Sequence, residues 1–156
     1  MTWFILVLIG LIVDQLSKWA VEQWLVHPIT IVSHFFRLEY HLNKGAAWSF
    51  LAGQNWGIHL LTGVSFIASL CFAIALVRTS DRGIKAACAM ILAGALGNGI
   101  DRLVHLGVTD FLSFQFGRYA FPVFNLADVF LVAGIFLLVI MVFTQEKRNR
   151  ISGGLK

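Results

Sequence analysis

Long apolar stretches alternate with shorter polar segments along the chain. Three of the apolar stretches, 56–77, 84–103 and 123–143, are close to the roughly 20 residues that a helix needs to cross a bilayer core about 30 Å thick. A fourth, 3–26, is apolar in its first half and then carries three charged residues. It has neither a basic start nor a small-residue cleavage site after its apolar run, so we expect a permanent first helix rather than a signal peptide.

The two longer connections between these helices carry different signals. Within 27–55, residues 29–40 are rich in β-branched and aromatic side chains, which indicates a strand, and residues 43–45 are typical of a turn. Residues 46–52 are expected to form a short interfacial helix. The connection 104–122 is expected to be a loop.

The composition supports a membrane protein. Of the 156 residues, 58% are hydrophobic and 13% are charged, and the mean hydropathy is +0.81. Soluble domains carry about a quarter charged residues, and a soluble chain this short would leave much of its surface in water. We therefore predict one integral membrane domain (1–156). Its fold class is an all-α membrane protein of four transmembrane helices, with a small β-rich, outward-facing cradle between the first and second helices.

The net charge of +4 does not indicate a nucleic-acid partner, because the basic residues lie within or at the margins of the apolar stretches. Seven of the twelve basic residues lie in the short connection near residue 80 and in the tail after residue 143, and three lie in the two longer connections. The positive-inside rule then places both termini in the cytoplasm and the two longer connections outside.

Several acidic residues lie in or beside the apolar stretches, where burying a charge costs free energy. At a helix centre an ionised side chain costs about 2.5–3.5 kcal/mol on insertion scales. Five of the eight acids lie in or beside the apolar stretches: Asp14, Glu22, Asp101, Asp110 and Asp128. Asp14 precedes Lys18 by four residues, the favourable order for an ion pair on one helical face. We expect this pair to hold the first helix in the bundle, because a paired carboxylate is a poor acid.

The end of the third apolar stretch combines small and polar residues. Gly94, Asn98 and Arg102 recur at intervals of four, and Gly97 stands one turn before Asp101. Glycines at this spacing let helices approach closely, and an asparagine can bond across the interface. The adjacent Asp101 and Arg102 are interpreted as a pair that braces the outer end of the bundle.

Asp110 and Asp128 have no obvious basic neighbour in the sequence. Taken singly, each is explained as a loop acid or a helix cap, but both lie on the outward side and the connection between them lets them meet. Two carboxylates held close in a low dielectric share a proton. The ionised member can take a proton from water while the protonated member polarises a peptide carbonyl. This is aspartyl-protease chemistry, which needs no metal and no cofactor.

Two other functions stay open at this point. A proton-coupled carrier or channel subunit also needs acids inside a bundle, but it predicts acids spread across the membrane, whereas only Asp14 lies deep. A non-catalytic scaffold assembled through Gly94 and Gly97 leaves Asp110 and Asp128 without a role. The five histidines lack the spacing of a zinc site, and the two cysteines lie singly in apolar stretches, so no metal site is expected.

Four blocks of polar and small residues follow one another along the chain. They are Asp14-Gln15-x-x-Lys18, Asn43-x-Gly45-Ala46-Ala47, Gly94-x-x-Gly97-Asn98-x-x-Asp101-Arg102, and Val108-x-Asp110-Phe111 followed by Phe124-Asn125-x-Ala127-Asp128. Each block is a weak signal alone. Together with four apolar spans, they resemble the lipoprotein signal peptidase family, the bacterial signal peptidase II, along nearly the whole chain.

This resemblance implies a multi-pass aspartyl endopeptidase of the bacterial cytoplasmic (inner) membrane, with its active site at the outward face and no cofactor. It implies cleavage of diacylglyceryl-modified prolipoproteins just before the lipidated cysteine of the lipobox, contact with membrane lipid, and inhibition by the cyclic peptide globomycin. Asp110 and Asp128 match the catalytic pair, and Asn43 and Arg102 match positions that help to hold substrate. The other matching positions support the site: Asp14, Lys18, Gly45, Asn98, Asp101 and Asn125.

Overall fold

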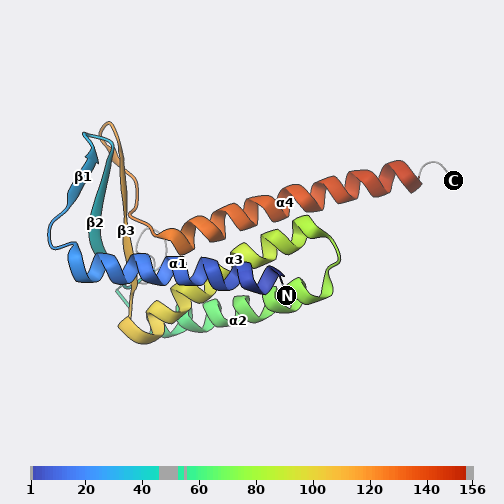
Figure 1. Cartoon of the computed structure of the whole chain (residues 1–156), viewed down its shortest axis with the longest axis horizontal. Coiled ribbons are helices and arrows are strands. Elements are labelled where there is room, and N and C mark those ends of the chain that lie inside the picture. Colours follow the sequence, from blue (N-terminus) through green and yellow to red (C-terminus); the bar gives the residue numbers. More distant parts are fainter. Residues whose placement is uncertain (1, 46–52, 55, 154–156) are drawn as a thin grey trace.

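The structure is a computed structural model that describes residues 2–45, 53, 54 and 56–153, with side chains as far as residue 147. In these residues, four helices are long and apolar enough to cross a membrane (Figure 1). They are α1 (Thr2–Trp24), α2 (Gly57–Arg78), α3 (Arg82–His105) and α4 (Leu126–Gly153). The predicted class of four transmembrane helices with a small sheet is therefore confirmed. The short helix expected at residues 46–52 lies outside the described residues.

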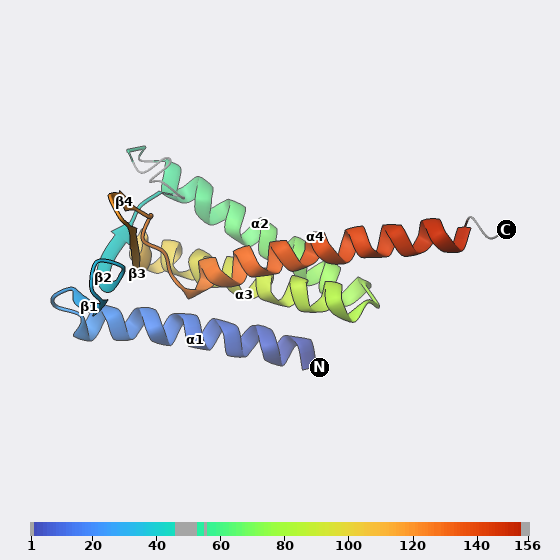
Figure 2. The same cartoon turned by 90° about the horizontal axis from the view of Figure 1, so that it is seen from above.

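Helix α3 forms the centre of the bundle and packs against each of the other three helices. Figure 2 shows α1 and α2 on opposite sides of it. Small residues make this packing close, as predicted: a Cβ atom on Gly94 would overlap the carbonyl oxygen of Ala127 in α4, and one on Gly97 would overlap the carboxylate of Asp14 in α1. The glycines of α3 thus bring the polar residues of α1 and α4 to its surface.

The sheet at one end of the bundle takes strands from both long connections. Its described strands, β1 (Ile29–Val32), β2 (Phe36–Asn43), β3 (Val108–Phe116) and β4 (Tyr119–Ala120), are antiparallel in that order. The strand expected within 29–40 is present as β1 and β2. The loop expectation for 104–122 was wrong, because this segment supplies β3, which pairs with β2 along most of its length.

The boundary of α4 also differs from the prediction. The helix begins at Leu126 rather than at residue 123, because the preceding backbone is paired with β3. The Phe124 N–H donates to the Leu112 carbonyl oxygen at 3.1 Å, and the Leu112 N–H donates back at 2.8 Å. Asn125, the residue before α4, caps the helix: its side-chain oxygen accepts the Asp128 N–H at 3.0 Å. This N-terminal cap places Asp128 in the first turn of the helix, beside β3.

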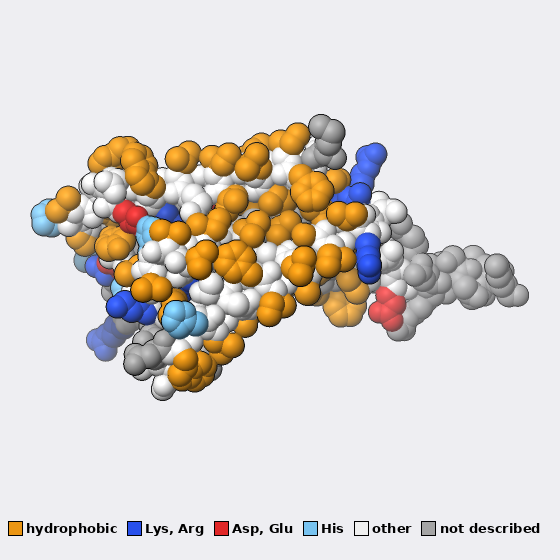
Figure 3. Space-filling view, turned by 90° about the horizontal axis from the view of Figure 1, so that it is seen from below, with side chains coloured by type: hydrophobic (Ala, Val, Ile, Leu, Met, Phe, Trp, Pro, Cys, Tyr) orange, Lys and Arg blue, Asp and Glu red, His pale blue; other side chains and the backbone are white. Residues whose placement is uncertain are grey.

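The outer surface of the bundle is apolar. Large hydrophobic side chains are exposed along α1, α2 and α4. In Figure 3 hydrophobic side chains cover the middle of the molecule, while charged side chains gather at its two ends. This distribution fits a bundle whose middle is surrounded by lipid and whose ends reach water.

Candidate active site

Asp110 and Asp128 come together at the end of the bundle that carries the sheet. Asp110 lies in β3, and Asp128 lies in the first turn of α4. Both line one cavity of about 1200 Å³, together with Asn43, Asn98 and Arg102. Asp110 is 2% exposed, so its carboxyl group lies at the inner wall of this cavity. The predicted meeting of the two acids is therefore present in the structure.

Asparagine side chains hold both carboxyl groups. The Asn125 side-chain amide donates to Asp110 Oδ1 at 2.6 Å, and the Asn125 backbone N–H donates to Asp128 Oδ2 at 3.3 Å. The second oxygen of each acid also accepts an amide N–H, from Asn43 to Asp110 at 3.0 Å and from Asn98 to Asp128 at 2.7 Å. Asn125 thus links the two acids directly, and all four carboxyl oxygens have a fixed donor.

Burial changes the protonation of Asp110. Loss of solvent, the largest cause, and the neighbouring charge of Asp128 together raise the pKa of this carboxyl to about 7, although the amides of Asn43 and Asn125 and the charge of Lys18 act in the opposite direction. A carboxyl group with a pKa near 7 holds and releases a proton at neutral pH. That property suits a general acid or base.

The turn after β2 orients Asn43. The Gly45 N–H donates to Asn43 Oδ1 at 2.9 Å, which confirms the turn expected at residues 43–45. Because Oδ1 is occupied, the amide nitrogen of Asn43 points to Asp110. Gly45 also meets Arg102, whose Nη2 donates to the Gly45 carbonyl oxygen at 3.4 Å.

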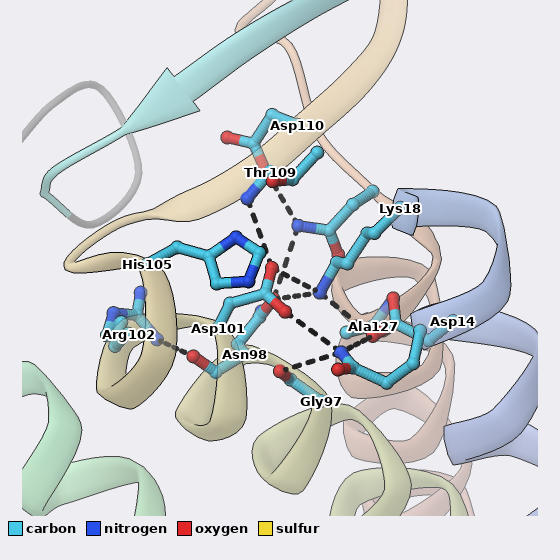
Figure 4. A network of polar contacts seen from close by, with 12 residues as sticks. Asp14, Lys18, Gly97, Asn98, Asp101, Arg102, His105, Thr109, Asp110 and Ala127 are labelled. Carbon is cyan, nitrogen blue, oxygen red and sulfur yellow. Dashed lines mark hydrogen bonds and ion pairs between the residues drawn. The ribbon is translucent and has the colours of Figure 1, made fainter. Parts of the chain in front are cut away.

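Lys18 is the centre of a second, deeper cluster (Figure 4). Its Nζ lies 2.8 Å from Asp14 Oδ2 and 3.2 Å from Asp101 Oδ2, and it donates to Asn98 Oδ1 at 3.0 Å. All four of these residues are buried. The predicted Asp14–Lys18 pair is present. Asn98 connects Lys18 to Asp128 by two hydrogen bonds, one to each residue.

The interpretation of Asp101 and Arg102 as an ion pair was wrong. Adjacent residues on a helix point in directions about 100° apart, so Asp101 faces Lys18 while Arg102 faces the cavity. The guanidinium group of Arg102 donates to Ser65 Oγ at 3.2 Å and to the Asn98 carbonyl oxygen at 3.4 Å. Its buried Nε has no hydrogen-bond partner among the described residues. Arg102 therefore keeps a donor for another group.

Two contacts at the site involve residues to which the sequence analysis gave no role. The Thr109 hydroxyl donates to Glu22, whose carboxylate also lies 3.2 Å from His105 Nδ1. The Gln15 side chain donates to Asp101 at 2.9 Å. The signals were the position of Glu22 one turn after Lys18 and the presence of Gln15 in the first motif block, but neither reveals a partner that is about 85 residues away in the chain.

The cavity continues from the two acids as a mainly apolar cleft between α2 and α4. Val64 and Ala68 line it from α2, and Val132 and Phe136 line it from α4. Its polar groups gather at the end near the sheet. The site therefore joins a polar end, which carries the two acids, to an apolar cleft between α2 and α4.

Comparisons with known proteins agree on one family. The family model for signal peptidase (SPase) II matches residues 6–144. A lipoprotein signal peptidase of Bacillus pumilus is 35% identical over 152 residues, covering 96% of this chain and 97% of that protein. One of Anoxybacillus flavithermus is 34% identical, covering 96% and 90%.

Solved structures show the same likeness. A bacterial membrane enzyme determined by the in meso method at 2.3 Å resolution superposes with a TM-score of 0.85 and 26% identity, covering 94% of this chain and 90% of that chain. A second, at 1.9 Å resolution, gives a TM-score of 0.79 and 28% identity over 90% and 92%. The chain thus belongs to the signal peptidase II family, the multi-pass bacterial inner-membrane proteases that remove signal peptides from prolipoproteins.

Proposed function

We propose that this signal peptidase is an aspartic endopeptidase in which Asp110 and Asp128 form the catalytic pair. The observation that carries the proposal is that two acids lining one cavity both accept hydrogen bonds from the buried Asn125. A single proton shared by two such carboxyl groups leaves one able to accept a proton and the other able to donate one.

The reaction follows from this shared proton. The ionised acid takes a proton from a water molecule, and the water oxygen forms a bond to the carbonyl carbon of the scissile peptide. The protonated acid donates to the carbonyl oxygen as negative charge develops there. The proton stays on this acid, and the carbonyl oxygen receives only its hydrogen bond. When the C–N bond breaks, the carbonyl forms again and the departing amine takes up the proton that came from water, so the pair returns to its starting state with one proton. Neither role belongs to one acid alone, because the proton belongs to the pair.

The apolar cleft supports a lipid-modified substrate cut just before its lipidated cysteine. A signal-peptide helix and acyl chains are apolar, and the cleft between α2 and α4 offers them apolar side chains as far as the two acids. At the polar end, Arg102 lines the cavity, where its guanidinium group suits a peptide carbonyl. Membrane lipid and the inhibitor globomycin are expected to occupy the same cleft when substrate is absent.

The distribution of charge supports a definite orientation in the membrane. The end of α2 carries Arg78 and the start of α3 carries Arg82 and Lys85, beside the connection between these helices at the end of the bundle opposite the sheet. By the positive-inside rule this end is cytoplasmic, so both termini are cytoplasmic and the two acids face outward. A secreted prolipoprotein presents its lipidated cysteine at that outer face.

The decisive experiment is cleavage of a diacylglyceryl-modified prolipoprotein by the purified full chain in lipid. Asp110→Asn and Asp128→Asn keep the shape of each side chain but cannot exchange the proton, and both are expected to lower kcat by at least about 1000-fold. Asp81→Asn is the matched control, because Asp81 caps α3 at the far end of the bundle, where asparagine can accept the same backbone N–H groups. Near-normal turnover by either site variant in folded protein would refute the catalytic pair, and proton flux into liposomes would then test the carrier alternative.

The cleft has its own test. Ala68→Trp puts an indole ring into the apolar cleft between α2 and α4. We expect kcat/KM to fall at least about 10-fold, because the ring occupies the space proposed for the substrate helix. Ile67→Trp adds the same ring at the neighbouring position, which is 66% exposed on the outer face of α2, and should leave kcat/KM within about twofold. Equal effects of the two substitutions would show that the cleft does not receive substrate.

A further inference from the structure

The residue that precedes each proposed catalytic acid is held in the same way. The Thr109 N–H donates to Asp101 Oδ2 at 3.1 Å, and the Ala127 N–H donates to Asp14 Oδ1 at 2.8 Å. Thr109 and Ala127 are both 0% exposed, so no water competes for these bonds. One buried carboxylate therefore fixes the backbone at the residue before Asp110, and another fixes it at the residue before Asp128.

The two anchoring carboxylates are joined to each other. Lys18 Nζ lies 2.8 Å from Asp14 and 3.2 Å from Asp101 (Figure 4). The Gln15 side chain makes a parallel bridge, donating to Asp14 at 3.2 Å and to Asp101 at 2.9 Å. Residues of one helix, α1, thus connect the anchor of β3 with the anchor of α4.

We propose that Lys18, Asp14 and Asp101 form a positioning yoke that sets the separation of the catalytic acids Asp110 and Asp128. This inference rests on the proposed function of those two acids. None of the three yoke residues lines the cavity, so they act through the backbone of Thr109 and Ala127 and do not touch substrate.

The fold explains why the separation of Asp110 and Asp128 has to be fixed by other residues. Asp110 lies on a strand and Asp128 on a helix, so any displacement of the sheet relative to the bundle would change the separation of the two acids. A shared proton requires the two carboxyl groups to stay close, and a displacement of about 1 Å at a reacting group can cost about 100-fold in rate. The yoke ties both backbones to a single side chain, so that the strand and the helix are held by one charge.

Lys18 also determines how Asn98 is oriented. Asn98 Oδ1 accepts from Lys18 at 3.0 Å and from the Asn125 amide at 3.2 Å. With its oxygen engaged twice, Asn98 turns its amide nitrogen to Asp128. Lys18 therefore acts on Asp128 in two ways. It orients Asn98, which donates to the Asp128 side chain, and it pairs with Asp14, which binds the backbone N–H of Ala127.

The test compares kinetics with local hydrogen exchange in the full chain in lipid. Lys18→Met is expected to lower kcat about 100-fold while KM changes less than threefold, because substrate still reaches the cleft. The amides of Thr109 and Ala127 should both lose protection from exchange. Leu76→Ala is the control for general destabilisation, since Leu76 is buried in the apolar core of α2: its Tm should fall while its kcat stays within about twofold of wild type.

Two milder variants decide the question if Lys18→Met does not fold. Asp101→Asn should expose the amide of Thr109 more than that of Ala127, and Asp14→Asn should do the reverse, with a loss of kcat in both. Unchanged kcat in the folded variants, or unchanged protection at both amides, would overturn the positioning yoke. The catalytic pair is tested separately: if Asp110→Asn and Asp128→Asn are inactive while Lys18→Met keeps a normal kcat, only this inference fails.

Discussion

The environment of Asp110 disfavours the ionised form of its carboxyl group. Burial is the main reason that its pKa lies at about 7, and the nearby Asp128 adds to the effect. In an unfolded chain the same group has a pKa near 3.9. Between these two values the folded protein holds a proton that the unfolded chain has already released.

This difference makes the stability of the protein depend on pH in a definite direction. Each unit of pH between about 5 and 7 favours the unfolded wild-type chain by about 1.4 kcal/mol through Asp110, and the effect levels off above pH 7 when both states have lost the proton. Asp110→Asn has no such proton. The free energy of unfolding of the variant, relative to wild type, should therefore rise between pH 5 and pH 7, as measured by denaturation of both proteins. A constant difference across this range would mean that Asp110 titrates near its ordinary value.

Thr109 offers a test of a single side-chain contact beside the site. Thr109→Val keeps the shape and the backbone bond to Asp101 but leaves the buried side of Glu22 without the hydroxyl donor. We expect a loss of about 1–3 kcal/mol in the free energy of unfolding. Thr62→Val is the matched control, because the Thr62 hydroxyl bonds within its own helix to the Ile58 carbonyl oxygen, and it should cost less than about 0.5 kcal/mol. Similar losses in the two variants would contradict a specific role for the Thr109–Glu22 contact.

At the residue scale, the sequence predicts which residues are unusual better than it predicts their partners. The acids were recognisable because charge is rare in apolar stretches, and the Asp14–Lys18 pair because i,i+4 spacing is a local rule. The partner of Asp101 was not recognisable: whether it faces Arg102 or Lys18 depends on the rotation of α3 against α1, which local spacing does not contain.

At the scale of the elements, helix α3 needs glycine at positions where another helix comes close to its backbone. A Cβ atom at Gly94 would overlap the backbone of α4 at Ala127 and also meet Leu131. Gly94→Ala should therefore push α4, which carries Asp128, away from α3. We expect a loss of about 1–3 kcal/mol in stability and a fall in kcat of at least about 10-fold.

Gly63 is the matched control for this substitution. It also lies within a transmembrane helix, α2, but a Cβ atom there would meet nothing within 4 Å. Gly63→Ala should leave kcat unchanged and make the protein as stable as wild type or slightly more stable, because alanine favours the helix. A similar loss in both variants, measured by thermal unfolding and prolipoprotein cleavage, would mean that helix propensity rather than close packing governs these positions.

The elements also show where sequence patterns were insufficient. The four helices were predictable because their length is fixed by the bilayer. Strand β3 was missed, although Leu112, Phe114 and Phe116 alternate with Ser113 and Gln115, because the alternation is interrupted at the polar Thr109 and Asp110. Those polar residues are buried by contacts with other elements, so the interruption marks the site itself.

The molecule as a whole has two chemically different ends. The end with the sheet carries the acids and the polar part of the cleft, and the other end carries the basic residues beside the connection between α2 and α3. A protease of exported proteins needs its site on the side to which its substrates are delivered. The orientation of the bundle is therefore as much a part of the function as the geometry of the acids.

Cysteine labelling in right-side-out spheroplasts tests this orientation directly. In a background with Cys71 and Cys88 replaced by alanine, Arg118→Cys places a thiol in the exposed connection between β3 and β4, and Ser80→Cys places one in the exposed connection between α2 and α3. A membrane-impermeant maleimide should label the first variant in intact spheroplasts and the second only after the membrane is opened, because the basic connection is retained in the cytoplasm. Both variants must still cleave prolipoprotein, so that the labelled protein is the active one. The reverse pattern would place the acids on the cytoplasmic side, where a translocated prolipoprotein no longer presents its lipidated cysteine, and the proposed reaction would then have no access to its substrate.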